Sequence, residues 1–491
     1  MTGAGEGSRW EMHWDEVAVF DANSASLGVD EHELMNAAGE ALASEVAKSA
    51  GEGGILFLCG PGNNGGDGFV AACSDSLAGK EVSVLSSHDS SKTEVSSSAR
   101  AMASEELAIH VWPEVPDGDW TLIVDCLLGA GGSGEGTELR PPVSEVAGWA
   151  ISTGLPILSC DIPTGLGGPD SLHPVRTVTF HSPKMGMTES GCGEIVVSEL
   201  PWPPGVRNCG VGDALRYPPV ESGASKGDRG RLLVVGGGPY HGAPILSGTA
   251  AARSGCDLVH VAMPGEAASR SKWPSSLIPE ELPDSKFMTP ESVAPLCDFI
   301  GSGRSPDAIV IGPGIGREDA SMDAAREVIS IAASKSIPMV VDADAISALP
   351  EGEWPSGLIG VATPHPREAE RWLSGKSPRE AIGNCTGEDS AIVITGHEDE
   401  IFGPQGRHCC ATGGHPRMAV GGTGDLLAGT IGGLLAQGMK PWPAARLACA
   451  VLREAGSRAA EEKGPGLLAE DVPVHIAHTL SDWTGMNDAG K

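Results

Sequence analysis

Apolar and polar positions along the first half of the chain change their period several times, which is typical of alternating strands and helices. Between residues 31 and 49, apolar side chains recur every four residues from Leu34 to Val46, and this spacing predicts an amphipathic helix. A second helix is predicted for residues 69–77. Four short apolar runs predict buried strands: residues 55–58, 82–85, 122–124 and 157–159.

The second half repeats the alternation after a segment rich in proline and glycine, residues 201–219. We place the domain boundary just beyond it, so that residues 1–221 and 222–491 form two domains. The strands predicted after the boundary are residues 231–235, 308–311, 339–341 and 391–394. Strands that alternate with helices predict parallel sheets covered on both faces, so the expected fold class is α/β.

The composition narrows the possible partners. The chain has 491 residues with a formal net charge of -32 and 4% aromatic residues, so we expect no nucleic-acid partner. It contains no leader-like amino terminus and no run of about twenty apolar residues that could span a membrane. The 12 cysteines are scattered, without paired Cys-x-x-Cys arrays, which favours free thiols in a reduced cytoplasm.

A glycine turn at residues 421–424 delivers one carboxylate, Asp425, to the start of an apolar helix. The amino terminus of a helix presents unpaired backbone N–H groups and the positive end of the helix dipole, so it can bind phosphate. Asp425 would then face a substrate hydroxyl, and the motif predicts phosphoryl transfer. The alternative is a tight turn in which Asp425 only caps the following helix.

A second glycine-rich loop, residues 60–68, follows the first predicted strand. Gly60, Gly62 and Gly65 satisfy the dinucleotide-binding spacing, but that pattern by itself is weak evidence. Two carboxylates, Asp125 and Asp161, follow later strands, where ligands collect in open α/β sheets. Carboxylates this close would raise one another's pKa, whereas a bound cation would relieve the repulsion and leave a proton shuttle free. Alternatively, each aspartate caps a turn.

Further motifs follow the strands predicted in the second half. They combine glycine, proline and charged residues, and they are residues 236–244, 312–316, 341–345 and 363–368. A lone histidine such as His365 is more often a turn residue, but its place beside three other strand-end motifs favours a binding site.

The first half resembles the NAD(P)H-hydrate epimerase family over most of residues 10–215. The matching motifs are residues 34–39, 63–68, 125–131, 161–166, and 177–180 leading to Pro183 and Lys184. The resemblance implies a Rossmann-like three-layer sandwich that interconverts the R and S forms of the hydrates NADHX and NADPHX. It also implies that Asp161 is the catalytic acid/base and that potassium is held by Asn64, Asp125 and Thr164.

The same resemblance implies a set of hydrate contacts in this domain. They are Asn63, Asn64, Gly65, Gly66, Asp67, Gly129, Ala130, Gly131, Gly132, Ser133, Gly134, Glu135 and Asp161. Thr164 stands where the family more often has serine, a change that keeps the hydroxyl oxygen. Ala130 replaces the usual threonine, so we expect one hydrogen bond fewer to the ligand.

The second half resembles the ADP/ATP-dependent NAD(P)H-hydrate dehydratase family over residues 226–471, with its motifs in order and nearly complete. The resemblance implies a ribokinase-like α/β domain that phosphorylates the C6 hydroxyl of S-NADHX or S-NADPHX and then eliminates phosphate. Asp425 would remove the hydroxyl proton while the turn amides stabilise the transferring group. The implied hydrate contacts are Ala243, Gly314, His365 and Asp425, and the implied nucleotide contacts are Thr395, Gly396, His397, Glu398, Asp399 and Gly424.

Magnesium is expected with the ADP or ATP phosphates. Where the family commonly has lysine before glycine at the end of a strand, this chain has Thr395 before Gly396. Threonine cannot supply the point charge of lysine, so the preference between ADP and ATP stays open. Gly414, His415 and Pro416 also lack the asparagine that the family often places there.

The leading hypothesis is a bifunctional repair enzyme, in which the first domain equilibrates the two epimers and the second consumes the S form. We expect small-molecule substrates only, NADHX or NADPHX with ADP or ATP, and a cytoplasmic homo-oligomer. The alternative is a ribokinase-like small-molecule kinase whose amino-terminal domain binds a ligand without turnover. That alternative predicts a stable phosphorylated product and no return of NADH.

Overall fold

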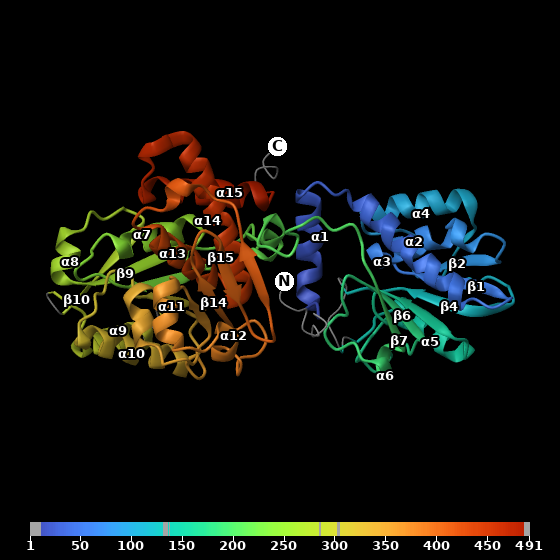
Figure 1. The fold of residues 1–491 in the computed structure, drawn as a ribbon, viewed down its shortest axis with the longest axis horizontal. Helices are drawn as coiled ribbons and strands as arrows, with labels where there is room; N and C mark the ends of the chain where they lie inside the picture. The colour runs from blue at the N-terminus through green and yellow to red at the C-terminus, as the bar shows by residue number, and fades with distance from the viewer. Residues whose placement is uncertain (1–10, 131–135, 137, 284–285, 302–304, 486–491) are drawn as a thin grey trace, which may run out of the picture. The chain divides into compact units, whose positions relative to one another are not determined.

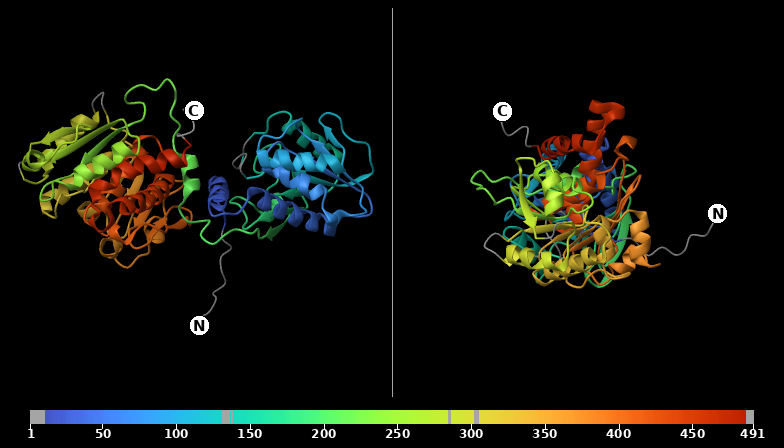
Figure 2. Two further views of the ribbon diagram at one scale, coloured as in Figure 1. Left: turned by 90° about the horizontal axis from the view of Figure 1, so that it is seen from above. Right: turned by 90° about the vertical axis from the view of Figure 1, so that its left-hand side faces the viewer.

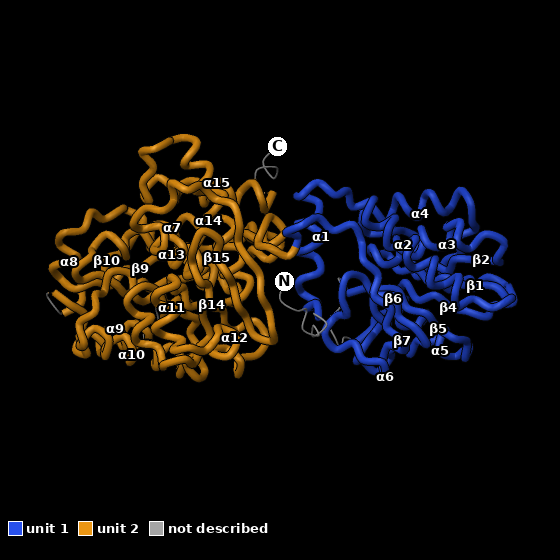
Figure 3. The backbone as a smooth tube through the Cα atoms, in the orientation of Figure 1, with its two compact units in different colours: residues 1–206 blue, residues 207–491 orange. Residues whose placement is uncertain are grey.

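The computed structural model describes residues 11–130, 136, 138–283, 286–301 and 305–485. The chain divides into two compact units, Met1–Val206 and Arg207–Lys491 (Figure 3). Each unit is an α/β structure built on its own sheet (Figures 1 and 2). The two-domain α/β class is therefore confirmed, whereas the limits of the two active domains at residues 221 and 222 stay a prediction.

The first unit is built on a seven-stranded sheet in the order β3-β2-β1-β4-β5-β6-β7, with every neighbouring pair parallel. Its strands are β1 Gly54–Cys59, β2 Val82–Ser86, β3 Ile109–Val111, β4 Trp120–Cys126, β5 Ile157–Cys160, β6 Arg176–Phe180 and β7 Glu194–Ser198. Its helices are α1 Val17–Ser26, α2 Glu31–Ser49, α3 Asn63–Ala72, α4 Glu94–Glu106, α5 Val143–Thr153 and α6 Glu189–Cys192.

Successive residues of β1 point to opposite faces of the sheet. Phe57 packs in the core that contains α2, α3 and α4, whereas Leu56 and Leu58 pack in the core that contains α5. All three side chains are fully buried. This apolar run therefore stands between two helical layers, as expected for a Rossmann-like three-layer sandwich.

Helix α3 begins at Asn63, six residues before the predicted start, and ends at Ala72. Glycine has low helix propensity, so the sequence pattern assigned the segment before Phe69 to a loop. Close packing explains why glycine is present in this helix: a Cβ on Gly65 would lie 1.9 Å from the carbonyl oxygen of Gly60. The prediction of residues 69–77 was thus wrong at both ends.

The second unit is built on a nine-stranded sheet in the order β10-β9-β8-β11-β12-β13-β14-β15-β16. Its strands are β8 Arg231–Val235, β9 Leu258–Pro264, β10 Leu277–Leu282, β11 Ala308–Ile311, β12 Met339–Val341, β13 Gly360–Ala362, β14 Ser390–Ile394, β15 Asp399–Phe402 and β16 His408–Ala411. Its helices are α7 Ala243–Arg253, α8 Gly265–Arg270, α9 Val293–Gly301, α10 Asp319–Ser334, α11 Pro366–Leu373, α12 Pro378–Ala381, α13 Thr423–Ala436, α14 Pro441–Lys463 and α15 Pro473–Trp483.

Helices cover both faces of this sheet as well. One core contains α7, α13, α14 and α15, and the other contains α9, α10 and α11. Helix α13 approaches α7 at backbone distance, because a Cβ on Gly429 would lie 2.0 Å from the carbonyl oxygen of Ser247. Gly433 likewise lies against Ala251. The glycines of α13 are therefore packing positions.

The predicted strands of the second half are confirmed, but the antiparallel end of the sheet was not foreseen. β14 pairs with β15 and β15 with β16, both antiparallel. Both added strands have four residues with charged or polar positions among them, so the apolar run that predicts a buried strand is missing.

None of the helices within the described ranges has the length and apolar character needed to cross a membrane.

Candidate active sites

In the first unit the strand order reverses between β1 and β4, and ligands of such sheets bind in the crevice beyond the carboxyl ends of the strands. The two strand ends are in backbone contact there, because a Cβ on Gly60 would stand 1.8 Å from the carbonyl oxygen of Leu127. Glycine at this position is therefore required by space. The loop after Gly60 leads directly into α3, whose first residues are Asn63 and Asn64.

Asp125, near the carboxyl end of β4, is fully buried and accepts hydrogen bonds on both carboxylate oxygens. Its Oδ1 accepts from Thr164 Oγ1 at 2.7 Å and from Leu127 N at 3.2 Å. Its Oδ2 accepts from Ser159 Oγ and from Thr164 N, both at 2.9 Å. These donors are neutral, and burial raises the pKa of Asp125 although the hydrogen bonds lower it. A cation would stabilise this carboxylate.

Asn64 has a buried amide whose oxygen and nitrogen both lack a hydrogen-bond partner among the described residues. A Cβ on Gly129 would come within 3.2 Å of the amide oxygen of Asn64. Thr164 Oγ1 accepts from the neighbouring Leu128 N at 3.1 Å. The segment after β4 thus lies beside Asn64, Asp125 and Thr164, the three predicted potassium ligands.

Asp161 follows β5 with a φ of 62°, in the left-handed region that strains a residue with a side chain. Its Oδ2 accepts from Ala130 N at 2.8 Å, and its Oδ1 lies 2.5 Å from Lys184 Nζ. The buried Lys184 ammonium also donates to Thr179 Oγ1 at 2.8 Å and to the Phe180 carbonyl oxygen at 3.1 Å. The carboxylate of Asp161 is therefore oriented from both of its oxygens.

Two more carboxyl groups interact with Asp161: Asp21 on α1 and Asp67 on α3. Burial and the charge of Asp161 raise the pKa of Asp21 to about 7, although Lys184 lowers it. Burial, with the charges of Asp161 and Asp21, raises the pKa of Asp67 well above its usual range. Carboxyl groups whose pKa is raised thus stand near an ion-paired carboxylate, an arrangement that suits general acid–base chemistry.

The structure places the remaining predicted hydrate contacts of this unit in two groups. Asn63, Gly65 and Gly66 lie in the first turn of α3, and Gly129 and Ala130 follow β4. The other predicted contacts lie outside the described residues: Gly131, Gly132, Ser133, Gly134 and Glu135.

Sequence reasoning missed two residues as members of this site. Lys184 stood in a matched motif but received no role, although a lysine near the end of a buried strand is an unusual cation that calls for a partner. No sequence motif pointed to Asp21, because only the tertiary structure brings its helix beside the sheet.

In the second unit the strand order reverses between β8 and β11, and a cavity of about 530 Å³ lies at the carboxyl ends of these strands. The cavity is lined by the loop before α7, the segments after β11 and β12, and the turn before α13: Pro239, Tyr240, His241, Gly242, Ala243, Leu246, Gly314, Ala343, Asp344, Gly421, Gly422 and Asp425. Three predicted hydrate contacts, Ala243, Gly314 and Asp425, therefore meet at one cavity.

Backbone forms much of the wall of this cavity. Gly314 has a φ of 74°, and a Cβ there would lie 2.1 Å from the carbonyl oxygen of Tyr240. A side chain is therefore excluded at this lining position, so a ligand could approach the main chain of Gly314 closely.

Asp425 lies in the first turn of α13, where Ser247 Oγ donates to its carbonyl oxygen at 2.8 Å. Burial raises the pKa of Asp425 to about 6. Asp342 accepts from Thr363 Oγ1 at 2.7 Å, and burial together with the charge of Asp425 raises its pKa to about 8. At neutral pH Asp425 is thus ionised and can act as a base, whereas Asp342 is protonated.

His365 and Gly424 do not line the cavity. His365 is half exposed and caps α11, because its Nδ1 accepts from Arg367 N at 3.0 Å and from Glu368 N at 3.3 Å. Gly424 has open space where a Cβ would stand, so a ligand could reach its main chain.

The predicted nucleotide loop, residues 395–399, follows β14. Thr395 N donates to the Pro364 carbonyl oxygen at 3.1 Å, so this loop lies beside the segment that holds His365. Asp399 accepts from Gly396 N at 3.0 Å through Oδ1, and its Oδ2 lies 2.9 Å from Arg453 Nε. The Asp399 carboxylate is thus engaged within the protein.

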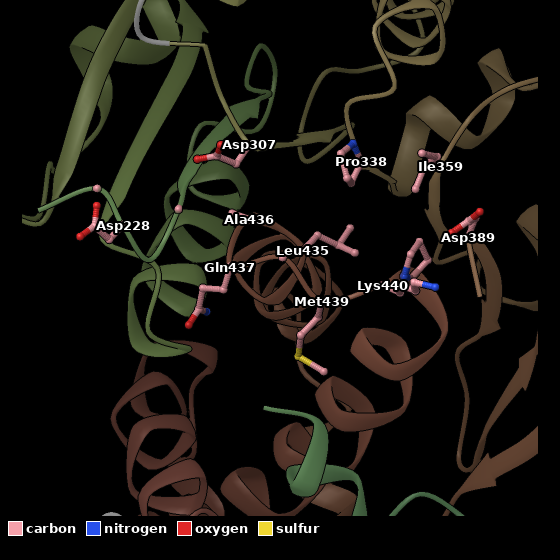
Figure 4. A pocket seen from close by; sticks show the side chains of 14 residues that line it. Asp228, Asp307, Pro338, Ile359, Asp389, Leu435, Ala436, Gln437, Met439 and Lys440 are labelled. Atoms are coloured by element: carbon pink, nitrogen blue, oxygen red, sulfur yellow. The ribbon is translucent and has the colours of Figure 1, made fainter. Parts of the chain in front are cut away.

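A second hollow, of about 460 Å³, lies at the amino ends of the same strands (Figure 4). Asp307 precedes β11 and Asp389 precedes β14, and Lys440 precedes α14. Ligands of open α/β sheets bind at the opposite edge, and Asp307 already accepts from Arg231 N at 2.8 Å. We therefore assign the chemistry of this unit to the cavity at Asp425.

Two family models match the chain. Residues 31–186 match a model described as YjeF-related protein N-terminus, and residues 232–477 match one described as NAD(P)H-hydrate dehydratase. Among curated proteins, a bifunctional NAD(P)H-hydrate repair enzyme Nnr of Hyperthermus butylicus is 35% identical over 95% of this chain and 91% of its own length. The corresponding enzyme of Methanothermobacter thermautotrophicus is 33% identical over 93% of each.

Solved structures similar to single parts of the chain include an ADP/ATP-dependent NAD(P)H-hydrate dehydratase from Bacillus subtilis, co-crystallised with ATP and Mg²⁺. It is 22% identical, with a TM-score of 0.46, and the match covers 55% of this chain and 96% of that chain. A ribokinase-like superfamily protein from Enterococcus faecalis is 25% identical, with a TM-score of 0.46, over 55% of this chain and 94% of its own.

Proposed function

This chain belongs to the family of bifunctional NAD(P)H-hydrate repair enzymes, and from that premise we propose how its residues carry the two reactions. The first unit epimerises R- and S-NAD(P)HX at the site around Asp161. The second dehydrates S-NAD(P)HX to NAD(P)H at the cavity around Asp425, at the expense of ADP or ATP. The observation that carries the proposal is the meeting of Ala243, Gly314 and Asp425 around one cavity.

Epimerisation requires the C6 hydroxyl to leave and return on the other face of the ring. The hydroxyl leaves C6 as water, which requires a proton donor. The water that returns to C6 must lose a proton, which requires a base. Asp67 suits the donor, because burial and the charges of Asp161 and Asp21 raise its pKa and so favour the protonated form. Asp161, oriented by Lys184 and Ala130 N, suits the base that takes the proton from the returning water.

Potassium fits the donor set beside this site. The unpartnered amide oxygen of Asn64, the buried carboxylate of Asp125 and the Thr164 hydroxyl are hard oxygen donors on neighbouring segments. When bound, the ion supplies positive charge that neutralises Asp125. The chain's own residues then hold the segment after β4 in place, since Leu127 N and Leu128 N both donate into the same network.

In the second unit, dehydration begins by converting a poor leaving group into a better one. Asp425 removes the proton of the C6 hydroxyl, which attacks the terminal phosphoryl group of the nucleotide. The amides of the glycine turn and the amino terminus of α13 stabilise charge on the transferring group. Phosphate then leaves C6 and a proton leaves C5, so that the C5–C6 double bond forms and the reduced ring is restored.

Magnesium fits this cavity as a partner of the nucleotide phosphates. No group of three or more His, Cys, Asp or Glu side chains that could hold a metal is present in the described part of the chain. Magnesium commonly takes most of its ligands from phosphates and water, so it needs no such cage. The ion would neutralise phosphate charge, while Asp425 and the turn amides act on the substrate.

The homo-oligomeric state and the cytoplasmic location stay predictions.

One assay tests both reactions. The purified chain is incubated with an R/S mixture of NADHX, ADP or ATP, potassium and magnesium, and NADH is followed by absorbance. Complete recovery is expected. Recovery that stalls near the S fraction would contradict the epimerase assignment, and no recovery with either nucleotide would contradict the dehydratase assignment. A stable phosphorylated product without NADH would favour the small-molecule kinase instead.

A further inference from the structure

The loop predicted to bind the nucleotide is held by one arginine of α14. Arg453 Nε donates to Asp399 Oδ2 at 2.9 Å. Its Nη1 donates to the His397 carbonyl oxygen at 2.8 Å, and its Nη2 donates to the Gly396 carbonyl oxygen at 3.1 Å. Three residues of the loop are thus bound to a single guanidinium group.

The same guanidinium group holds a second segment. Arg453 Nη1 also donates to the Gly413 carbonyl oxygen at 2.8 Å, and Gly414 lies against the aliphatic part of the arginine. Gly413 and Gly414 lead into the turn that delivers Asp425. Arg453 therefore joins the loop after β14 to the segment that precedes the catalytic helix.

The next turn of α14 supports that segment as well. Met418 packs on Gly456, where a Cβ would stand 1.8 Å from the Met418 sulfur atom. Arg453 and Gly456 are three residues apart, so they lie on the same face of the helix. This face of α14 therefore contacts both approaches to the proposed nucleotide site.

We infer that Arg453 is a positioning residue for the nucleotide, which shapes the loops at residues 395–399 and 413–424 in a chain that has Thr395 at the strand end. The inference rests on the proposed dehydratase function. Arg453 acts through the backbone and not by touching phosphate, because its side chain is only 11% exposed and its donors are directed at Asp399 and three carbonyl oxygens. Its loss should therefore weaken nucleotide binding more than it slows the chemistry.

The test compares Arg453→Ala, Arg453→Lys and the wild type for kcat and for the KM of ADP, ATP and S-NADHX. R453A removes four hydrogen bonds from a charged donor to the two loops, so it should raise the nucleotide KM about tenfold to a hundredfold. The KM of the hydrate and kcat at saturating nucleotide should change less than threefold. R453K should recover part of the loss, since it keeps the charge but not the forked geometry.

Arg458 offers a matched control on the same helix, because it pairs with Glu454 and Asp482 and contacts neither loop. R458A should leave every KM unchanged. Should R453A fail to fold, Asp399→Asn tests the same claim by removing one charge from the network. It should raise the nucleotide KM about threefold to tenfold.

An unchanged nucleotide KM in R453A or D399N, in a sample whose wild type restores NADH, would overturn the inference. An equal rise in the hydrate KM would overturn it too, because a general distortion of the cavity would then explain the loss. A wild type that restores no NADH with either nucleotide would instead contradict the proposed function itself, so the two failures are distinguishable.

Discussion

Asp161 and Asp425 both lie near the point where the strand order of a sheet reverses, since Asp161 accepts from the segment after β4 and Asp425 lines the cavity beyond β8 and β11, but their surroundings differ in kind. Asp161 is held by side chains and an ion pair, with Lys184 at 2.5 Å and two further carboxyl groups nearby. Asp425 faces a cavity of about 530 Å³ whose lining includes the glycines Gly242, Gly314, Gly421 and Gly422. The same topology therefore supports a site for moving protons on a small ring and a site for receiving phosphates.

This difference follows from the change in charge during each reaction. Proton transfer between carboxyl groups requires their pKa values to be separated, which takes burial and specific charged partners. In phosphoryl transfer the negative charge is distributed over several phosphate oxygens, so several hydrogen-bond donors must surround it. Backbone amides supply these donors without filling the cavity with side chains. Substitutions should therefore act differently at the two sites.

The largest effect is expected from Asp425→Asn. The amide cannot accept the hydroxyl proton, so the dehydratase kcat should fall about 10²–10⁴-fold. Epimerisation, followed as the exchange of R- and S-NADHX by chromatography without nucleotide, should keep its wild-type rate. A dehydratase rate within threefold of the wild type would show that Asp425 is not the base.

Lys184→Met should have the next largest effect, and on stability as well as on rate. It leaves Asp161 without its ion pair in a buried site, and breaking a buried pair costs about 3–5 kcal/mol. The unfolding free energy of the first unit, measured with urea and intrinsic fluorescence, should fall by that amount. Lys184→Arg is the matched variant that keeps the charge, and equal stability of the two variants would contradict the role of the ion pair.

Gly314→Ala tests the backbone wall of the second site. The added methyl group meets the carbonyl oxygen of Tyr240 in a residue that already has a positive φ, so we expect a loss of about 2–3 kcal/mol in stability and a rise in the hydrate KM. Gly421→Ala is the control, since nothing lies within 4 Å of the place where its Cβ would stand. Similar losses in both variants would contradict the close approach.

A smaller effect is expected from a change of pH on the dehydratase reaction. Asp425 must be a carboxylate to act as a base, and its pKa is raised to about 6, so kcat/KM of the dehydratase should fall about tenfold per pH unit below 6. Above about pH 8, ionisation of Asp342 beside Asp425 adds a like charge, and the rate should fall again. A profile that stays flat from pH 5 to 9 would contradict this assignment of base and neutral acid.

The smallest effect is expected from the removal of potassium. Asp125 accepts four hydrogen bonds from the protein, so the fold should persist when potassium is removed, and the epimerase rate should fall only about threefold to tenfold. Sodium or a large organic cation in the buffer serves as the control. The dehydratase, assayed with pure S-NADHX, should be unaffected, and an equal loss in both reactions would argue against a site specific to the first unit.

Much of this arrangement could be predicted from the sequence. The helix α2 and the central strands show strong apolar periodicity, and the resemblance to the epimerase and dehydratase families is confirmed by a relative that matches 95% of the chain. The start of α3 could not be predicted, because its glycines follow from contacts with Gly60 and Met35 and not from local propensity. The positions of Asp21 and Lys184 beside Asp161 could not be predicted either, because the tertiary structure brings them together. The residue roles themselves stay predictions until the variants are assayed.

Contact between α7 and α13 has a mechanical consequence. Gly429 and Gly433 leave no room for a side chain between the two backbones, so the helix that carries Asp425 packs directly on the helix that begins at Ala243. A larger residue at Gly429 or Gly433 would therefore push α13 away from α7 and change the separation of Asp425 and Ala243, although neither glycine lines the cavity.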